Sequence, residues 1–135
     1  MTAKEVVLAF YQSDLANDAS VVPNFFHKGC ELHWNSSRGF MILKYDDILS
    51  FFEGTRKAYE SLRFEFSHVI QENDFVTTRH TLFANTIENP DEEVALAHFI
   101  SIWEIKDGKL YRSHEISQLA DESTLKANSF REIKI

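Results

Sequence analysis

An acidic residue at the centre of an apolar run near the C-terminus is the residue best suited to proton transfer. Glu115 lies in the run Lys109–Ser117, which Asp107-Gly108 separates from the longer run Val94–Lys106. Asp-Gly between two such runs predicts a β-hairpin, because a type I′ turn needs positive φ at both central residues. A carboxylate buried on a hairpin loses water, so its charge must be paired or its pKa must rise. The pattern indicates a pocket with an acid in its wall.

The two-residue period of a strand decides which side chains share a face with this acid. Those beside Glu115 are Tyr111, Ser113 and Ser117. The longer run is apolar on both alternating faces, which predicts a strand covered on both sides. One of its faces carries Phe99, Ser101 and Trp103. The lone hydroxyl of Ser101 on that face is either a ligand donor or a group bonded to its own neighbours.

Helical patterns come first in the chain and strand patterns follow. We expect helices over 2–15, 19–26 and 46–59, with Lys28-Gly29 ending the second one. We expect strands over 30–35, 40–43, 63–71, 75–86, 94–106 and 109–117. This order predicts an α+β fold in which three N-terminal helices pack in a strongly curved, mainly antiparallel sheet of about six strands. Residues 1–120 are expected to form one domain and 121–135 a C-terminal tail.

Composition excludes several classes of partner. The chain has 135 residues and a net charge of −7, and it lacks the basic stripe that a nucleic-acid binder needs. Cys30 is the single cysteine, so no internal disulfide forms. No apolar run reaches the roughly 18 residues of a membrane span. We therefore expect a cytoplasmic protein with neither nucleic acid nor membrane as a partner.

Several short motifs give the chain a family resemblance. They are Ala9-Phe10-Tyr11, Asn17-Asp18, Asn24-Phe25-Phe26 and the stretch from Trp103 to Leu110. With the order of elements, they make residues 2–118 resemble the nuclear transport factor 2-like superfamily, which includes SnoaL-like polyketide cyclases, limonene-epoxide-hydrolase-like enzymes and ketosteroid isomerases. The resemblance implies a cone-shaped α+β barrel with the Glu115 face on its concave side, but a shared fold does not assign a function.

The ketosteroid isomerase pattern fits only in part. It implies a functional tyrosine at Tyr11, and this residue is present. The two acids of that pattern are replaced by Trp34 and Ser101. We therefore do not expect ketosteroid-type isomerisation.

The epoxide hydrolase pattern fits better. It falls on His33-Trp34-Asn35, on Arg79-His80-Thr81 and on Glu115, with Thr81 where the family has an acid. The resemblance thus implies Glu115 as general base and Arg79 as its partner, with His33 or Asn35 positioning water or substrate. The alternatives are a purely structural Arg79–Glu115 ion pair, and a first strand that turns Trp34 rather than its two neighbours inward.

The expected pocket suits a small apolar or aromatic ligand and no cofactor. Its expected lining combines aromatic rings with a few hydroxyls: Tyr11, Trp34, Phe83, Phe99, Ser101, Trp103 and Ser113. An enzyme would use Glu115 for hydrolysis, isomerisation or cyclisation by proton transfer. The alternatives are a ligand-binding module without chemistry, and a structural homodimeric module whose interior is filled by residues such as Trp34 and Phe66.

The histidines and the outer sheet face complete the expectations. No two of the six histidines have a metal-ligand spacing, so no metal site is expected. Strand parity is expected to place His80, His98 and His114 on the face opposite Glu115. That convex face would also carry an apolar set: Val94, Leu96, Ile100, Ile102 and Ile116. Such an apolar face needs a cover, which predicts a homodimer built on it.

Overall fold

The computed structural model of the protein describes residues 1–120 and Phe130. Its helices are α1 (Ala3–Gln12), α2 (Val21–Phe25) and α3 (Tyr45–Ala58). Its strands are β1 (Phe26–Ser36), β2 (Gly39–Lys44), β3 (Tyr59–Glu72), β4 (Phe75–Thr86), β5 (Glu93–Lys106) and β6 (Lys109–Leu119). In this part of the chain, no helix has the length and apolarity needed to cross a bilayer. The predicted tail, apart from Phe130, lies outside the described residues.

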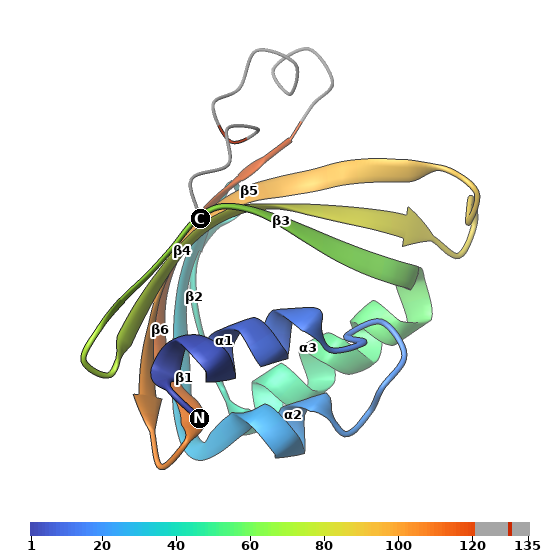
Figure 1. Ribbon diagram of the computed structural model, residues 1–135. Coiled ribbons are helices and arrows are strands. Elements are labelled where there is room, and N and C mark those ends of the chain that lie inside the picture. The colour runs from blue at the N-terminus through green and yellow to red at the C-terminus, as the bar shows by residue number, and fades with distance from the viewer. Residues whose placement is uncertain (121–129, 131–135) are drawn as a thin grey trace.

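The six strands form one sheet in the order β2-β1-β6-β5-β4-β3. Neighbouring strands are antiparallel except β1 and β6, which are parallel. Figure 1 shows this sheet curving around the three helices, with α1 inside the curve. The sheet stays open between β2 and β3, its two edges. The predicted α+β fold, with three helices in a curved and mainly antiparallel sheet, is confirmed.

Local sequence signals explain where the elements begin and turn. The Thr2 hydroxyl accepts a hydrogen bond from the backbone N–H of Glu5 at 3.1 Å and so caps α1. The Asp47 carboxylate accepts one from the backbone N–H of Lys44 at 2.9 Å at the start of α3. Between β5 and β6, Asp107 and Gly108 have φ values of 55° and 71°. These positive angles confirm the predicted hairpin turn.

One expectation about an element boundary is wrong, and the cover expected over the outer face of β5 is not supplied by the described residues. The second helix ends at Phe25, and Lys28-Gly29 lies inside β1 rather than at a helix end. On β5, Ile100 and Ile102 are 47% and 42% exposed, so the described chain leaves the outer face of this strand uncovered. All three helices pack on the concave side of the sheet, so none of them covers the convex face (Figure 1).

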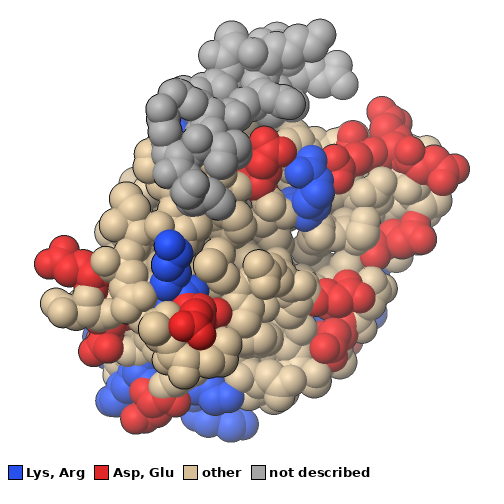
Figure 2. Space-filling model, viewed as in Figure 1, with Lys and Arg blue, Asp and Glu red and all other residues tan. Residues whose placement is uncertain are grey.

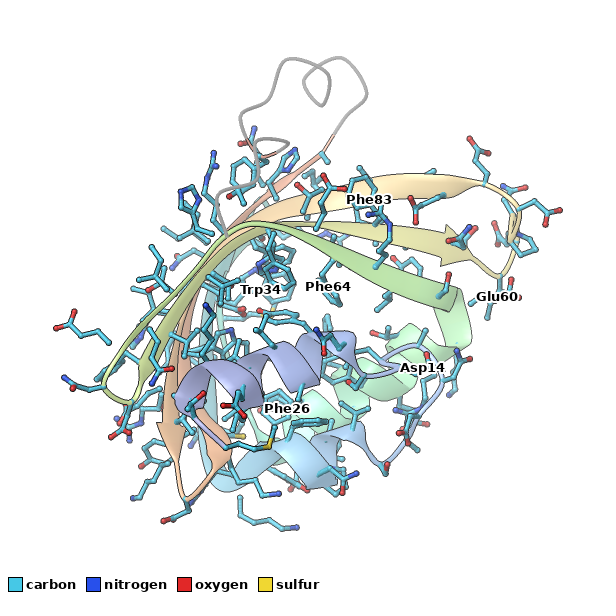
Figure 3. The ribbon with its side chains drawn as sticks, in the orientation of Figure 1. Asp14, Phe26, Trp34, Glu60, Phe64 and Phe83 are labelled. Carbon is cyan, nitrogen blue, oxygen red and sulfur yellow. The ribbon has the colours of Figure 1, made fainter. Side chains whose placement is uncertain are left out.

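Aromatic side chains hold the helices in the curve of the sheet. The ring of Phe10 from α1 lies 5.3 Å from that of Phe26 and 5.8 Å from that of Trp103, centroid to centroid. Figure 3 shows Phe26, Trp34 and Phe64 in the interior between helices and sheet. Rings of this size bury much apolar area each and pack edge to face, as these do. The same rings also form part of the wall of a cavity between the helices and the sheet.

Candidate functional site

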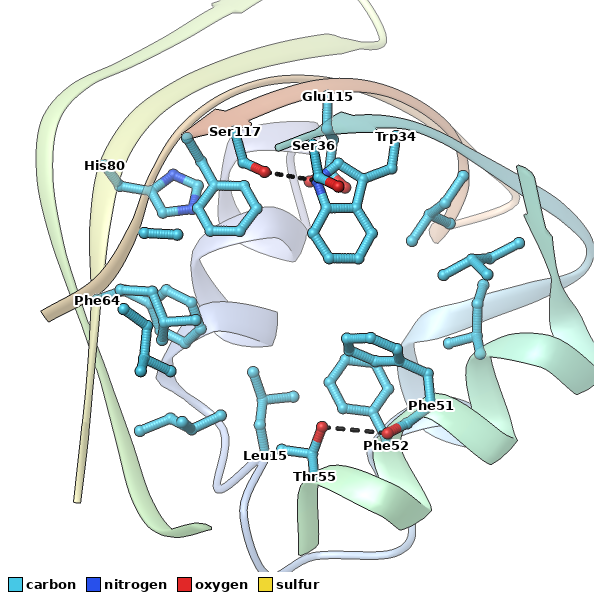
Figure 4. A pocket seen from close by; sticks show the side chains of 18 of the residues that line it. Leu15, Trp34, Ser36, Phe51, Phe52, Thr55, Phe64, His80, Glu115 and Ser117 are labelled. Atoms are coloured by element: carbon cyan, nitrogen blue, oxygen red, sulfur yellow. Dashed lines mark hydrogen bonds between the residues drawn. The ribbon is translucent and has the colours of Figure 1, made fainter. Parts of the chain in front are cut away.

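A cavity of about 420 Å³ lies between the helices and the concave face of the sheet. Its walls are mostly aromatic and aliphatic, with rings from α1, α3 and the strands (Figure 4). The turn between β1 and β2 and the C-terminal end of α3 supply polar lining residues: Ser36, Ser37, Arg38 and Thr55. Two titratable side chains in the wall are central to its chemistry, Glu115 and His80.

Glu115 lies on the concave face of β6, as expected, and borders the cavity. Its carboxylate accepts a hydrogen bond of 2.8 Å from the Ser101 hydroxyl. Burial raises the pKa of this carboxyl from its usual 4.5 to about 7, while the Ser101 hydrogen bond acts in the opposite direction. At neutral pH the group is therefore populated both as an acid and as a base, which suits proton transfer.

The sheet register places Glu115 in a row of side chains that crosses four strands. Ser101 on β5 pairs with Glu115 on β6 and with Thr78 on β4, while Trp34 on β1 pairs with Glu115 from the other side. The indole N–H of Trp34 donates to the Ser117 hydroxyl at 2.8 Å. Figure 4 shows Trp34, Ser117 and Glu115 together at one wall of the cavity. The carboxyl thus has hydroxyl neighbours on one side and an indole ring on the other.

Tyr11 reaches this row from α1. Its hydroxyl accepts a hydrogen bond of 3.0 Å from the indole N–H of Trp103. Burial, and secondarily the charge of Glu115, raise the pKa of the Tyr11 hydroxyl far above its usual value. Because the indole N–H can only donate, the proton of the Tyr11 hydroxyl remains available for another acceptor.

His80 belongs to the same wall, although we expected it on the opposite face of the sheet. Its ring stacks on Phe99 with the centroids 5.2 Å apart and the planes at 7°. Its Nδ1 lies 3.1 Å from the Thr78 hydroxyl, and burial lowers its pKa to about 3. The imidazole is therefore neutral at pH 7. The expectation was wrong because β4 is mixed on both faces, so the pattern alone did not define the inward set.

Arg79 points away from the cavity, and its predicted pairing with Glu115 is wrong. Its neighbours Thr78 and His80 are buried on the concave side, so alternation turns Arg79 to the outer face. There the guanidinium donates to the Ser67 hydroxyl at 3.1 Å and lies 3.7 Å from the centroid of the Phe130 ring. Glu115 is left without an ion pair among the described residues.

On the first strand, Trp34 faces the cavity, while His33 and Asn35 border a groove on the convex face. The expectation that His33 and Asn35 point inward is therefore wrong. His33 instead lies 3.1 Å from the Glu31 carboxylate, and its ring stacks on His114 with centroids 5.0 Å apart. A sequence signal for this choice existed, because the alternating partners of Trp34 are apolar and must face the core: Cys30 and Leu32.

The remaining expected lining residues divide into three groups. Phe99 and Trp103 border the cavity, whereas Phe83 lies on the outer side with the Arg63 guanidinium 4.2 Å from its ring centroid. Phe83 as a lining residue is therefore wrong, for the same reason of strand phase as His80. Ser101 and Ser113 are fully buried behind the wall rather than in it. The Ser113 hydroxyl has no hydrogen-bond partner among the described residues.

The described residues also contain no group of three or more metal-ligating side chains arranged to hold an ion. His98 and His114 lie on the outer side, where the Nδ1 of His98 is 2.8 Å from the Thr81 hydroxyl. The chemistry that the site itself offers is hydrogen bonding and proton transfer in apolar surroundings.

Similar structures agree with this architecture. IdmH from Streptomyces antibioticus, for which polyketide cyclase activity has been suggested, superposes with a TM-score of 0.70 at 13% identity, over 94% of this chain and 97% of that one. AclR from Streptomyces galilaeus, a suggested hydroxylase, gives 0.68 at 17% identity, over 93% and 88% of the two chains. An epoxide hydrolase from M. tuberculosis resembling limonene-epoxide hydrolase gives 0.66 at 14% identity, over 85% and 81%.

The comparison of sequences is more specific. A search of curated proteins finds no match to this chain. The model of the SnoaL-like domain family matches residues 7–113, a range that includes helices as well as strands that build the cavity. The chain therefore belongs to the SnoaL-like family, within the nuclear transport factor 2-like superfamily.

Proposed function

We propose that this SnoaL-like protein binds a small, mostly apolar molecule in its cavity and moves a proton on it with Glu115. The reaction class is hydrolysis, isomerisation or cyclisation by proton transfer. The observation that carries the proposal is a carboxyl with a pKa of about 7 that borders an apolar cavity. A general acid or base is most effective when its pKa lies near the working pH.

The other groups of the wall have supporting roles in this proposal. Ser101 fixes one oxygen of the Glu115 carboxylate by its hydrogen bond of 2.8 Å and leaves the other oxygen free. The neutral imidazole of His80 and the Tyr11 hydroxyl offer uncharged polar contacts to a substrate. Trp34 and Phe99 form a flat apolar surface, since their rings stack with centroids 6.2 Å apart at 27°.

A second candidate is ligand binding without chemistry. It is favoured by the lack of a second carboxyl in the cavity wall formed by the described residues. A purely structural module is less well supported, because the interior keeps a cavity of about 420 Å³ that Trp34 does not fill.

The test is hydrogen–deuterium exchange on a panel of small enolisable ketones in D₂O, followed by NMR. We expect the wild-type protein to accelerate exchange on some of them and Glu115→Gln to reduce that rate at least a hundredfold. The matched control is Glu92→Gln, the same change at an exposed loop position, which should keep the rate. Equal exchange rates for the wild-type protein and for Glu115→Gln would contradict proton transfer by Glu115 and leave ligand binding without chemistry as the function.

A further inference from the structure

The Glu115 carboxylate borders the cavity without a cation to balance it. Its one hydrogen bond is from the Ser101 hydroxyl, and none of the ion pairs in the described part of the chain includes it. Among the described lining residues, Arg38 is the single one with a permanent positive charge, and it lies on the exposed turn between β1 and β2. A buried carboxylate is normally paired, so a positively charged ligand group would be favoured beside Glu115.

The walls around this carboxylate are aromatic. Trp34 is its cross-strand neighbour on β1, and Phe99 stacks on Trp34. Phe51 from α3 meets Trp34 edge to face with the centroids 5.8 Å apart. Figure 4 shows the rings of Phe51 and Phe52 on the α3 side of the cavity, facing Trp34. The faces of such rings carry negative potential and attract cations, most strongly organic ammonium groups that are weakly hydrated.

We propose that the cavity takes an organic ammonium ion with an apolar body, its cationic head beside the Glu115 carboxylate and against the Trp34 ring. The proposal rests on the ligand-binding function proposed above and names its ligand class. An anionic head is disfavoured at this place because it would face the carboxylate in apolar surroundings.

The rest of the molecule supports a cation over an anion. The net charge of −7 raises the local concentration of cations around the protein. Figure 2 shows acidic side chains gathered over the end of the molecule where β4 and β5 meet, in the loop that contains Asp91 and Glu92. A cation bound at Glu115 would also favour the ionised form of the carboxyl, whose pKa is raised to about 7 mainly by burial, against the lowering effect of the Ser101 hydrogen bond.

The test compares two ligands of the same shape that differ in charge: phenyltrimethylammonium and tert-butylbenzene. Their dissociation constants are measured by NMR titration at pH 8.5, following the indole N–H signals of Trp34 and Trp103. We expect the cation to bind at least tenfold more tightly than its neutral isostere. In Glu115→Gln this ratio should fall to about one while the affinity for tert-butylbenzene stays the same, and Glu92→Gln should keep the ratio.

The pH dependence supplies a second arm. At pH 5.5 Glu115 is protonated, so the preference for the cation should fall in the wild-type protein and stay flat in Glu115→Gln. A ratio of one or less at pH 8.5, or a tenfold ratio that persists in Glu115→Gln, would overturn the ammonium proposal. Binding of tert-butylbenzene but not of the cation would contradict the ammonium proposal and still support an apolar binding pocket. If neither ligand shifts the indole signals, the ligand-binding function falls as well.

Discussion

The carboxyl of Glu115 makes the stability of the protein depend on pH. Its pKa is raised in the folded state to about 7, from a usual value of 4.5. The folded protein therefore holds a proton that the unfolded chain releases between these values. A raised carboxyl pKa favours folding at low pH, and this contribution is lost as the pH rises through 7.

We therefore expect Glu115→Gln to change the pH profile of unfolding. Between pH 4.5 and 8 the wild-type free energy of unfolding should lose up to about 3 kcal/mol that the variant retains, given roughly 1.4 kcal/mol per pKa unit. The measurement is urea unfolding at several pH values. Parallel profiles for the two proteins would contradict the raised pKa.

The hydrogen bond from Ser101 acts on the same titration. Removing it in Ser101→Ala takes away a contact that favours the charged carboxylate, so the pKa of Glu115 should rise further, by the equivalent of about 1 kcal/mol. The titration is followed by ¹³C NMR of the Glu115 carboxyl carbon.

Ser113→Ala is the matched control for that experiment. Ser113 lies two residues from Glu115 on the same face and is as fully buried as Ser101, but its hydroxyl has no partner among the described residues. Its removal should leave the pKa of Glu115 unchanged. Equal shifts in both variants would mean that general loss of polarity, rather than the specific hydrogen bond, tunes the acid.

Among the elements, the hairpin of β5 and β6 determines where the acid is placed. Asp107 and Gly108 set the turn, and a shift of register between Glu104 and Ile105 then brings Ser101 opposite Glu115. Gly108 has a φ of +71°, an angle that side chains with a Cβ rarely adopt. The glycine is therefore required by the backbone and not by space, because nothing lies within 4 Å of a Cβ added there.

Two glycine substitutions distinguish the effect of the backbone angle on stability from the effect of the space around the added Cβ. Gly108→Ala should destabilise the protein by about 1 kcal/mol, the cost of a left-handed angle for alanine. Gly54→Ala, inside α3 and equally open around its Cβ, should stabilise it by about 0.5–1 kcal/mol through helix propensity. Thermal unfolding of the two variants measures both effects. The same sign for both would contradict the role assigned to the turn.

The elements also show what the sequence could predict and what it could not. The hairpin and the long strands were predictable because the turn residues and the apolar runs are local signals. The inward face of β4 was not, since Thr78 and His80 are as polar as the outward Thr77 and Arg79. The burial of His80 depends on Phe99 and Tyr11, which come from other elements. On β1, by contrast, the apolar partners of Trp34 did mark the inward face.

At the scale of the whole molecule, the centre of the convex sheet face is apolar, and the described residues leave its side chains partly exposed. Its central side chains from β1, β2, β5 and β6 form a groove with partly exposed isoleucines and a phenylalanine: Phe40, Ile100, Ile102 and Ile116. A face of this kind is stable in water when a second surface covers it. The homodimer predicted from the sequence would use this face, although Leu96, which we assigned to it, borders the cavity instead.

We expect light scattering after gel filtration to give twice the 15.7 kDa mass of the chain at micromolar concentration. Ile116→Asp should give a monomer, because a charge on this face cannot be buried without a partner. Ile87→Asp introduces the same charge at a position of similar exposure outside the face and should leave the dimer intact. A wild-type mass of one chain would contradict the prediction.

The place of β6 in the sheet has a consequence for synthesis on the ribosome. This strand lies between β1 and β5 yet is translated after both. The hydrogen bond from Trp34 to Ser117 therefore cannot form until a residue 83 positions further along the chain has been synthesised. Until β6 emerges, the nascent chain exposes two unpaired strand edges of the kind that invite aggregation. A truncated mRNA that ends before this strand would therefore yield a polypeptide without β6 and without Glu115. Cellular quality control would have to remove such a polypeptide.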